Sequence, residues 1–251
     1  MDLTIVIPAL NEELKIRRDI DAAYLFVTEC GLDAEIIVVA DGSTDGTVAV
    51  SEAAVADIPI LRVLPLTGQR GKGAAIKRGF SEARGAIAMF ADAGLCVPFS
   101  DALKGLELLN AHTCDIAQGS RSHPGTVMVR LQPRWRQMGS KAFRYVLSFI
   151  MGIPWSFGDT QCGFKMYRLD VARSLYSQLF TPGYMFDIEI ILRAKKQGYR
   201  IAQFPVTWSN DADSRYHPIK GTVQVLRQLL SIRFRLAFDS ASEPVSVPQE
   251  L

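Results

Sequence analysis

Residues 3–13 read LTIVIPALNEE, a run of five residues of which four are apolar, followed by a proline and a segment that ends in two glutamates. The apolar run predicts a buried strand, and the polar segment predicts a helix from about Glu12. Apolar runs at 35–40 (EIIVVA) and 60–64 (ILRVL) likewise precede helices expected after Asp45 and from Lys72, and AIAMFA follows at 86–91. This alternation predicts an α/β fold with a mostly parallel sheet.

Polar residues follow these strands where ligands bind in open α/β sheets, beyond the carboxyl ends. In VVADGSTDGT (38–47), Asp41 leaves a buried strand and offers a carboxylate to a nucleotide base or ribose. In GQRGKGAAIKRGF (68–80), Arg70 and Lys72 lie among glycines that allow close approach to a diphosphate at a helix start. In FADAG (90–94), Asp92 offers the carboxylate oxygens that Mg²⁺ or Mn²⁺ prefers.

The composition limits the classes of protein to which the chain can belong. Its 251 residues, 48% apolar and 22% charged, predict one globular catalytic domain over 1–220. A formal net charge of +2 gives no reason to expect nucleic acid as a partner. The four cysteines show no metal-ligand spacing and are expected to be reduced thiols of a cytoplasmic protein.

Two later segments combine cations with apolar residues. One covers 122–155, and the other is VQVLRQLLSIRFRLAF (223–238), inside the predicted amphipathic helix 221–238. No stretch reaches the ~18 consecutive apolar residues of a membrane span. We therefore expect these helices either to lie at a membrane surface or to pack into the protein's own core or a dimer. Residues 239–251 are expected to form a flexible tail.

Taken in order, these motifs resemble glycosyltransferase family 2, whose members have the GT-A fold. The resemblance implies a nucleotide-sugar donor and a mixed, mostly parallel sheet with amphipathic C-terminal helices. It implies that Asp92 binds Mg²⁺ or Mn²⁺ as the first acid of an Asp-x-Asp motif. It also implies a set of nucleotide-binding residues: Pro8, Ala9, Asn11, Glu12, Asp41, Lys72, Asp92 and Ala93.

Later motifs resemble dolichyl-phosphate glucosyltransferases and related polyprenyl-phosphate hexose synthases. They are GSR (119–121), DTQCGFK (159–165), FDIE (186–189) and VTW (206–208). The resemblance implies that Asp92, Asp159, Gln161 and Arg121 form the catalytic centre. It also implies a second set, which would hold the acceptor and its phosphate: Arg121, Arg136, Ser140 and Arg215. The implied reaction is inverting transfer of a hexose to a polyprenyl phosphate at the cytoplasmic face of a membrane. The resemblance favours UDP-glucose as the donor and leaves GDP-mannose as an alternative.

One residue departs from the family pattern. Gly94 stands where the second acid of the metal motif is expected, and Cys96 is the next position that could supply a ligand. A single carboxylate with diphosphate oxygens still suits Mg²⁺, which keeps several waters, although with lower affinity. On the sequence alone, Gly94→Asp is expected to tighten the metal dependence.

Alternative functions stay open at this level. A hydroxyl acceptor would need Asp159 or Asp187 as general base, whereas a lipid phosphate is already ionised. The incomplete acid pair also permits a non-catalytic nucleotide-binding module. A nucleotidyltransferase is disfavoured, because such an enzyme should have a glycine-rich loop with basic residues where this chain has PALNEE.

Overall fold

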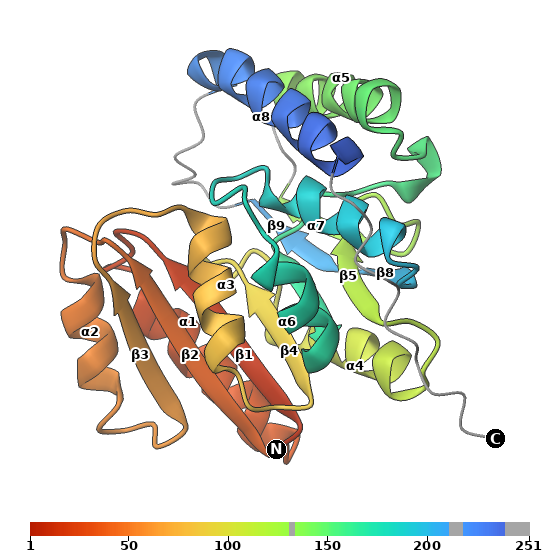
Figure 1. Cartoon of the computed structure of the whole chain (residues 1–251). Helices are drawn as coiled ribbons and strands as arrows, with labels where there is room; N and C mark the ends of the chain where they lie inside the picture. The colour runs from red at the N-terminus through yellow and green to blue at the C-terminus, as the bar shows by residue number, and fades with distance from the viewer. Residues whose placement is uncertain (131–133, 211–217, 239–251) are drawn as a thin grey trace.

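The computed structural model describes residues 1–130, 134–210 and 218–238 (Figure 1). The side chains of 130, 134–138, 140–142, 156 and 218–224 lie outside this description. The predicted tail at 239–251 also lies outside the described residues, so that expectation stays a prediction.

The first half of the chain alternates strands and helices as the sequence predicts. Its elements are β1 (Leu3–Ala9), α1 (Ile16–Glu29), β2 (Ala34–Asp41), α2 (Thr47–Ala54), β3 (Leu61–Leu66), α3 (Lys72–Glu82), β4 (Ile87–Ala91), η1 (Phe99–Asp101), α4 (Ala102–Asn110) and β5 (Ile116–Ser120). The second half is less regular. Its elements are β6 (Val127–Arg130), α5 (Arg134–Met151), η2 (Trp155–Phe157), β7 (Phe164–Arg168), α6 (Leu169–Ser177), α7 (Phe186–Lys196), β8 (Ile201–Pro205), β9 (Thr207–Ser209) and α8 (Pro218–Phe238).

The main sheet has the strand order β3-β2-β1-β4-β7-β5-β8. All neighbours in it are parallel except β7, which runs antiparallel to both β4 and β5. The strands β2 and β3 lie on one side of β1, and the chain then crosses to the other side of β1 to form β4. The carboxyl ends of β1 and β4 therefore meet at a topological switch point, where α/β proteins bind ligands.

Helices cover both faces of the sheet (Figure 1), and successive residues of β1 contribute to opposite cores. Ile5 packs with α1, α2 and α4 on one face, whereas Val6 packs with α3, α6 and α7 on the other. Burial on both faces explains why the strands read as continuous apolar runs rather than as alternating patterns.

The first helix begins at Ile16, later than the predicted start at about Glu12. Residues 11–13 instead contact the loop after β2. Asn11 has a positive φ of 52°, and the Glu12 N–H donates to Thr47 Oγ1 over 2.7 Å. The chain therefore forms a turn at the sheet edge before the helix can start.

Helices α5 and α8 pack together and against α7, at the top of the view in Figure 1. Leu147 of α5, Ile188 of α7 and Leu229 of α8 are buried in one shared cluster. The interpretation that these helices pack into the protein's own core is therefore confirmed for one face of each helix. The opposite faces keep exposed large side chains, which include Tyr145, Phe149, Leu226, Leu230, Phe234 and Phe238. Among the described residues, no helix is long and apolar enough to cross a membrane.

Candidate functional site

Two loops are joined by hydrogen bonds at the carboxyl ends of β1 and β2. The Thr44 N–H donates to Asn11 Oδ1 over 2.7 Å, and the Asn11 N–H donates to Ser43 Oγ over 3.0 Å. Glu13 accepts the Gly46 N–H over 2.7 Å. Residues 11–13, part of the predicted nucleotide-binding segment, are thus held by hydrogen bonds to the loop after β2.

Asp41 ends β2 and holds the glycine-rich loop that leads into α3. Its two carboxylate oxygens accept the backbone N–H groups of Arg70 and Gly71, each over 2.7 Å. Gly71 has a φ of 104°, in a region that suits glycine, and a side chain there would meet the carbonyl of Pro182. Asp41 is buried, so its clear role in the structure is to shape this loop.

Lys72, the first residue of α3, faces Asp92 at the end of β4. The Lys72 Nζ lies 2.5 Å from Asp92 Oδ1, and it also lies over the rings of Phe90 and Phe186. Burial alone would lower the pKa of Lys72, but the charges of Asp92 and Asp187 outweigh it and raise the pKa. Lys72 is therefore a fixed cation beside the predicted metal-binding carboxylate.

Gly163, in the DTQCGFK motif, makes room for Asp92. The Asp92 N–H donates to the Gly163 carbonyl over 2.9 Å. A Cβ atom at position 163 would overlap the Asp92 carboxylate. The glycine of the motif therefore lets β7 approach the acid closely.

Arg121 and Asp159 form a second ion pair across the cleft. Arg121 donates three hydrogen bonds to the Asp159 carboxylate: from Nε over 2.6 Å, from Nη2 over 2.8 Å and from its backbone N–H over 3.0 Å. The Gln161 N–H also donates to this carboxylate. Burial would raise the pKa of Asp159, but Arg121 and these N–H donors lower it to about 2. Asp159 is thus ionised at neutral pH and fixes the position of Arg121.

A cavity of about 180 Å³ joins these groups. It is smaller than the roughly 300–1,000 Å³ of pockets that enclose drug-sized ligands, so it suits one end of a ligand. Its lining combines one member of each ion pair, Asp92 and Arg121, with polar and apolar neighbours. The full lining is Ala91, Asp92, Leu95, Cys96, Val97, Phe99, Arg121, Gln161, Cys162, Gly163, Phe164, Trp208 and Asn210.

Three groups close to the cavity are almost fully buried: Lys165, Asp187 and Cys162. Lys165 and Asp187 form an ion pair that is almost fully buried, and burial raises the pKa of Asp187. Burial also raises the pKa of the Cys162 thiol to about 12, so this thiol stays protonated. All four cysteines are free, as expected from the sequence.

The predicted metal site contains Asp92 and little else from the protein. Among the described residues, no group of three or more His, Cys, Asp or Glu side chains could hold a metal. The Asp92 side chain is 36% exposed, and Lys72 Nζ already lies 2.5 Å from its Oδ1, so a metal ion here would share the carboxylate with the Lys72 ammonium. Gly94 has a φ of 106°, a conformation that residues with side chains rarely adopt. The expectation that Gly94→Asp tightens metal dependence therefore meets a backbone obstacle.

The structure brings together Asp92, Lys72, Arg121, Asp159 and Gln161. The other predicted nucleotide-binding residues lie at the same sheet edge but outside the cavity lining: Pro8, Ala9, Asn11, Glu12 and Asp41. Ala93 follows Asp92 and packs against the core. Arg136 and Ser140 belong to α5, although their side chains lie outside the description, and Arg215 lies outside the described residues altogether.

Three contributors to the site had no role assigned from the sequence. Lys165 and Trp208 lie in motifs that were recognised, DTQCGFK and VTW, so their positions gave a signal. Asp19 gave none. It is one of several charged residues in α1, yet its carboxylate is buried and accepts the Gly94 N–H over 2.5 Å.

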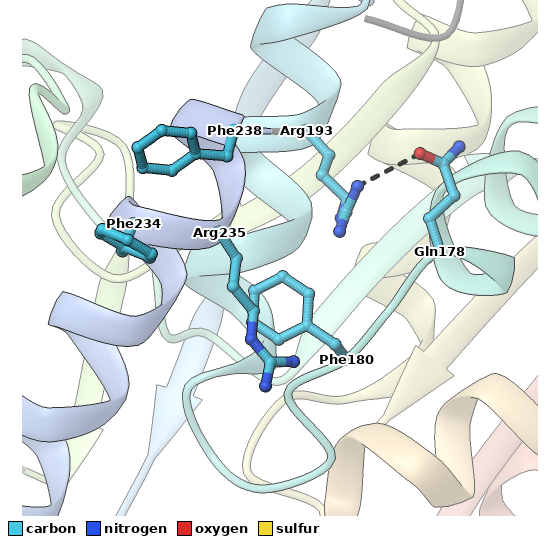
Figure 2. Close-up of a pocket in the computed structure, with 6 residues that line it drawn as sticks. All are labelled: Gln178, Phe180, Arg193, Phe234, Arg235 and Phe238. Atoms are coloured by element: carbon cyan, nitrogen blue, oxygen red, sulfur yellow. Dashed lines mark hydrogen bonds between the residues drawn. The ribbon is translucent and has the colours of Figure 1, made fainter. Parts of the chain in front are cut away.

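A second cavity, of about 540 Å³, lies between α7, α8 and the loop after α6 (Figure 2). Phe180 lies between the guanidinium groups of Arg193 and Arg235, and Phe234 and Phe238 form the apolar side. The six described residues that line this cavity include no carboxylate. It lies on α8 rather than at the carboxyl ends of the strands, so the smaller cavity is the candidate active site.

Comparison with known proteins gives consistent matches over most of the chain. The model of the family described as glycosyl transferase family 2 matches residues 4–176. The dolichyl-phosphate beta-glucosyltransferase of Dictyostelium discoideum is 30% identical over 246 residues, covering 93% of this chain and 74% of that protein. The Homo sapiens protein of the same name is 31% identical over 247 residues, covering 93% and 75%.

Among solved structures, glucosyl-3-phosphoglycerate synthase from Mycobacterium tuberculosis, in complex with Mn²⁺ and UDP-glucose, superposes with a TM-score of 0.70. The match covers 96% of this chain and 80% of that one at 20% identity. The fold that the two chains share is the GT-A fold predicted from the sequence.

Proposed function

Because this chain belongs to glycosyl transferase family 2, we propose that it transfers a hexose from a nucleotide sugar to the phosphate of a polyprenyl lipid, with inversion at the anomeric carbon. UDP-glucose is the favoured donor. The names of the relatives, dolichyl-phosphate beta-glucosyltransferases, support both the sugar and the lipid phosphate.

The observation that carries this proposal is the state of the carboxylates around the cavity. Asp159 has a pKa of about 2 and is held by Arg121, so it is a poor proton acceptor. Asp187 is buried against Lys165, and Asp92 is paired with Lys72. A hydroxyl acceptor needs a base to remove its proton, whereas a phosphate monoester attacks already ionised. The described site therefore favours a phosphate acceptor.

The proposed reaction moves no proton. A phosphate oxygen of the acceptor forms a bond to the anomeric carbon while the bond from that carbon to the donor diphosphate breaks. The electron pair leaves with the diphosphate. Lys72 and Arg121 are placed to stabilise this departing charge, because both are cations held in a partly buried site. Asp159 fixes the Arg121 fork in its orientation.

Asp92 is the residue that would hold a divalent metal. Its partly exposed carboxylate, beside the Lys72 ammonium, offers the oxygen ligands that Mg²⁺ or Mn²⁺ prefers, and the donor diphosphate and water would have to supply the others. When bound, such an ion neutralises charge on the diphosphate leaving group. The Mn²⁺ in the complex of the M. tuberculosis synthase makes Mn²⁺ the first ion to test.

The surface of α5 and α8 fits a role at the cytoplasmic face of a membrane. Neither helix contains an aspartate or glutamate, whereas each contains four lysines or arginines. On α8, Leu226, Leu230, Phe234 and Phe238 recur every four residues and are exposed. Helices with basic but no acidic residues in their sequence, and with exposed apolar side chains, match an anionic lipid interface.

A radiolabelled-sugar transfer assay tests the proposed function. Purified protein is incubated with UDP-glucose or GDP-mannose, a polyprenyl phosphate and Mn²⁺ or Mg²⁺, and label in the organic phase is counted. We expect lipid-linked label from UDP-glucose that disappears in Asp92→Ala and persists in Asp57→Ala, an exposed control in the Arg17 ion pair. Nucleotide binding without label from any donor would count against transfer to lipid phosphate.

A further inference from the structure

The turn that carries Asp92 has an unusual backbone. Gly94 has a φ of 106° and Leu95 a φ of 49°. Two successive residues with positive φ are uncommon, and Leu rarely adopts this region. The turn is fixed at its ends, where the Asp92 N–H donates to Gly163 and the Ser209 N–H donates to the Cys96 carbonyl, each over 2.9 Å.

The middle of this turn is bonded to a residue of α1. The Gly94 N–H donates to Asp19 Oδ2 over 2.5 Å. The second oxygen, Asp19 Oδ1, accepts two hydrogen bonds from Arg18, over 3.0 and 3.2 Å. One carboxylate therefore connects the catalytic turn to a surface arginine.

Asp19 occupies a position where an amphipathic helix normally has an apolar residue. It lies on the buried face of α1 with Ile16, Ile20 and Ala23, and it is 1% exposed. A buried carboxylate is costly unless hydrogen bonds compensate it. In this structure, the Gly94 N–H and the Arg18 guanidinium supply that compensation.

We propose that Asp19 is a positioning residue, which holds the 92–96 turn so that the Asp92 carboxylate faces Lys72 and the cavity. The inference rests on the proposed function, since it assumes that Asp92 serves donor binding. The family pattern places an acid on this turn at the position of Gly94. In this chain Gly94 offers only its backbone, and its N–H donates to Asp19 of α1 in a turn whose φ favours glycine.

Removing the hydrogen bond from the Gly94 N–H to Asp19 should misplace Asp92 without unfolding the domain. The turn keeps its two end contacts, but the Gly94 N–H loses its acceptor, and the positive φ values lose their support. A displacement of about 1 Å at a catalytic group can reduce the rate by about 100-fold. We expect Asp19→Ala to reduce kcat/KM by about that factor, with a matching loss of Mn²⁺-dependent UDP affinity.

The test compares three variants of the full chain. Asp19→Ala removes the acceptor, Asp19→Asn keeps a neutral one, and Asp21→Ala removes an exposed carboxylate from the same helix. Because a neutral hydrogen bond has about half the strength of a charged one, Asp19→Asn should regain about tenfold of the lost kcat/KM. Asp21→Ala should match the wild type.

Hydrogen exchange of the Gly94 amide, followed by NMR, gives a readout that does not depend on activity. We expect faster exchange at Gly94 in Asp19→Ala, with the amides of β1 and β2 unchanged. Calorimetry then measures UDP binding with and without Mn²⁺. Unchanged Gly94 exchange, or a lower melting temperature with unchanged UDP affinity and kcat/KM, would overturn the positioning role.

The two proposals fail in different ways. If wild-type protein transfers no sugar but Asp19→Ala accelerates exchange at Gly94 and weakens Mn²⁺-dependent UDP binding, the positioning role of Asp19 is supported and the lipid-phosphate proposal fails. If the wild type is active and Asp19→Ala is equally active, only the role of Asp19 is refuted.

Discussion

Asp159→Asn should show whether the buried pair of Asp159 with Arg121 contributes more to stability than a surface ion pair does. The substitution keeps the side-chain shape but removes the counter-charge of Arg121, whose side chain is only 27% exposed. The difference between a carboxyl pKa of 3.8 and one of about 2 corresponds to about 2.5 kcal/mol of stability. Breaking a buried pair typically costs about 3–5 kcal/mol. We expect a loss of about 3 kcal/mol in the free energy of unfolding at pH 7.

The chain contains a matched control for this variant. Asp115 receives the same three donors from Arg200: its backbone N–H over 2.8 Å, Nε over 3.2 Å and Nη2 over 3.0 Å. That arginine is 57% exposed, and exposed pairs contribute about 0.2–1 kcal/mol. Urea denaturation of Asp159→Asn and Asp115→Asn measures both losses. Equal losses in the two variants would refute the reasoning.

The pH dependence of the same variant has a definite sign. The pKa of Asp159 is lowered in the folded protein. Its contribution to the free energy of unfolding is therefore fully present when the pH is above the ordinary carboxyl pKa of 3.8. The contribution is lost as the pH falls through about 2. The stability difference between wild type and Asp159→Asn should therefore shrink between pH 4 and pH 2. A difference that stays constant over this range would contradict the assignment of charge.

Two further substitutions test the cleft and the membrane surface. Gly163→Ala should displace the Asp92 carboxylate and abolish transfer, whereas Asp57→Ala, the exposed control, should leave the transfer rate unchanged. Transfer at the wild-type rate by Gly163→Ala would refute the close packing at Asp92. Leu230→Ser should weaken flotation with anionic vesicles, and Leu25→Ser, an exposed control on α1, should not. Equal flotation of these two variants would count against an interfacial α8.

Much of the fold could be predicted because the first half of the chain follows local rules. The runs at 35–40 and 86–91 are confirmed as β2 and β4, and α3 begins at Lys72 as expected. Polar residues at the carboxyl ends of β1, β2 and β4 predicted a ligand-binding edge of the sheet, and the candidate cavity with Asp92 lies at the end of β4. These features depend on hydrophobic periodicity and glycine placement, which a single sequence contains.

Other features depend on contacts between distant residues, which periodicity does not contain. The antiparallel insertion of β7 between β4 and β5 is one such feature. The pairing of Arg121 with Asp159 is another, since the two residues are 38 positions apart. Asp19 illustrates the limit most clearly, because an acid in a helix normally faces solvent, and only its contact with Gly94 reveals its position.

The choice between a phosphate and a hydroxyl acceptor can be measured with two lipids that differ in one group. Wild-type protein is incubated with labelled UDP-glucose and either a polyprenyl phosphate or the polyprenol of the same chain length. Because the described carboxylates around the cavity are held in ion pairs, we expect label in the organic phase with the phosphate and none with the alcohol. Comparable transfer to the alcohol would contradict lipid-phosphate glycosylation and would require a base that these residues do not supply.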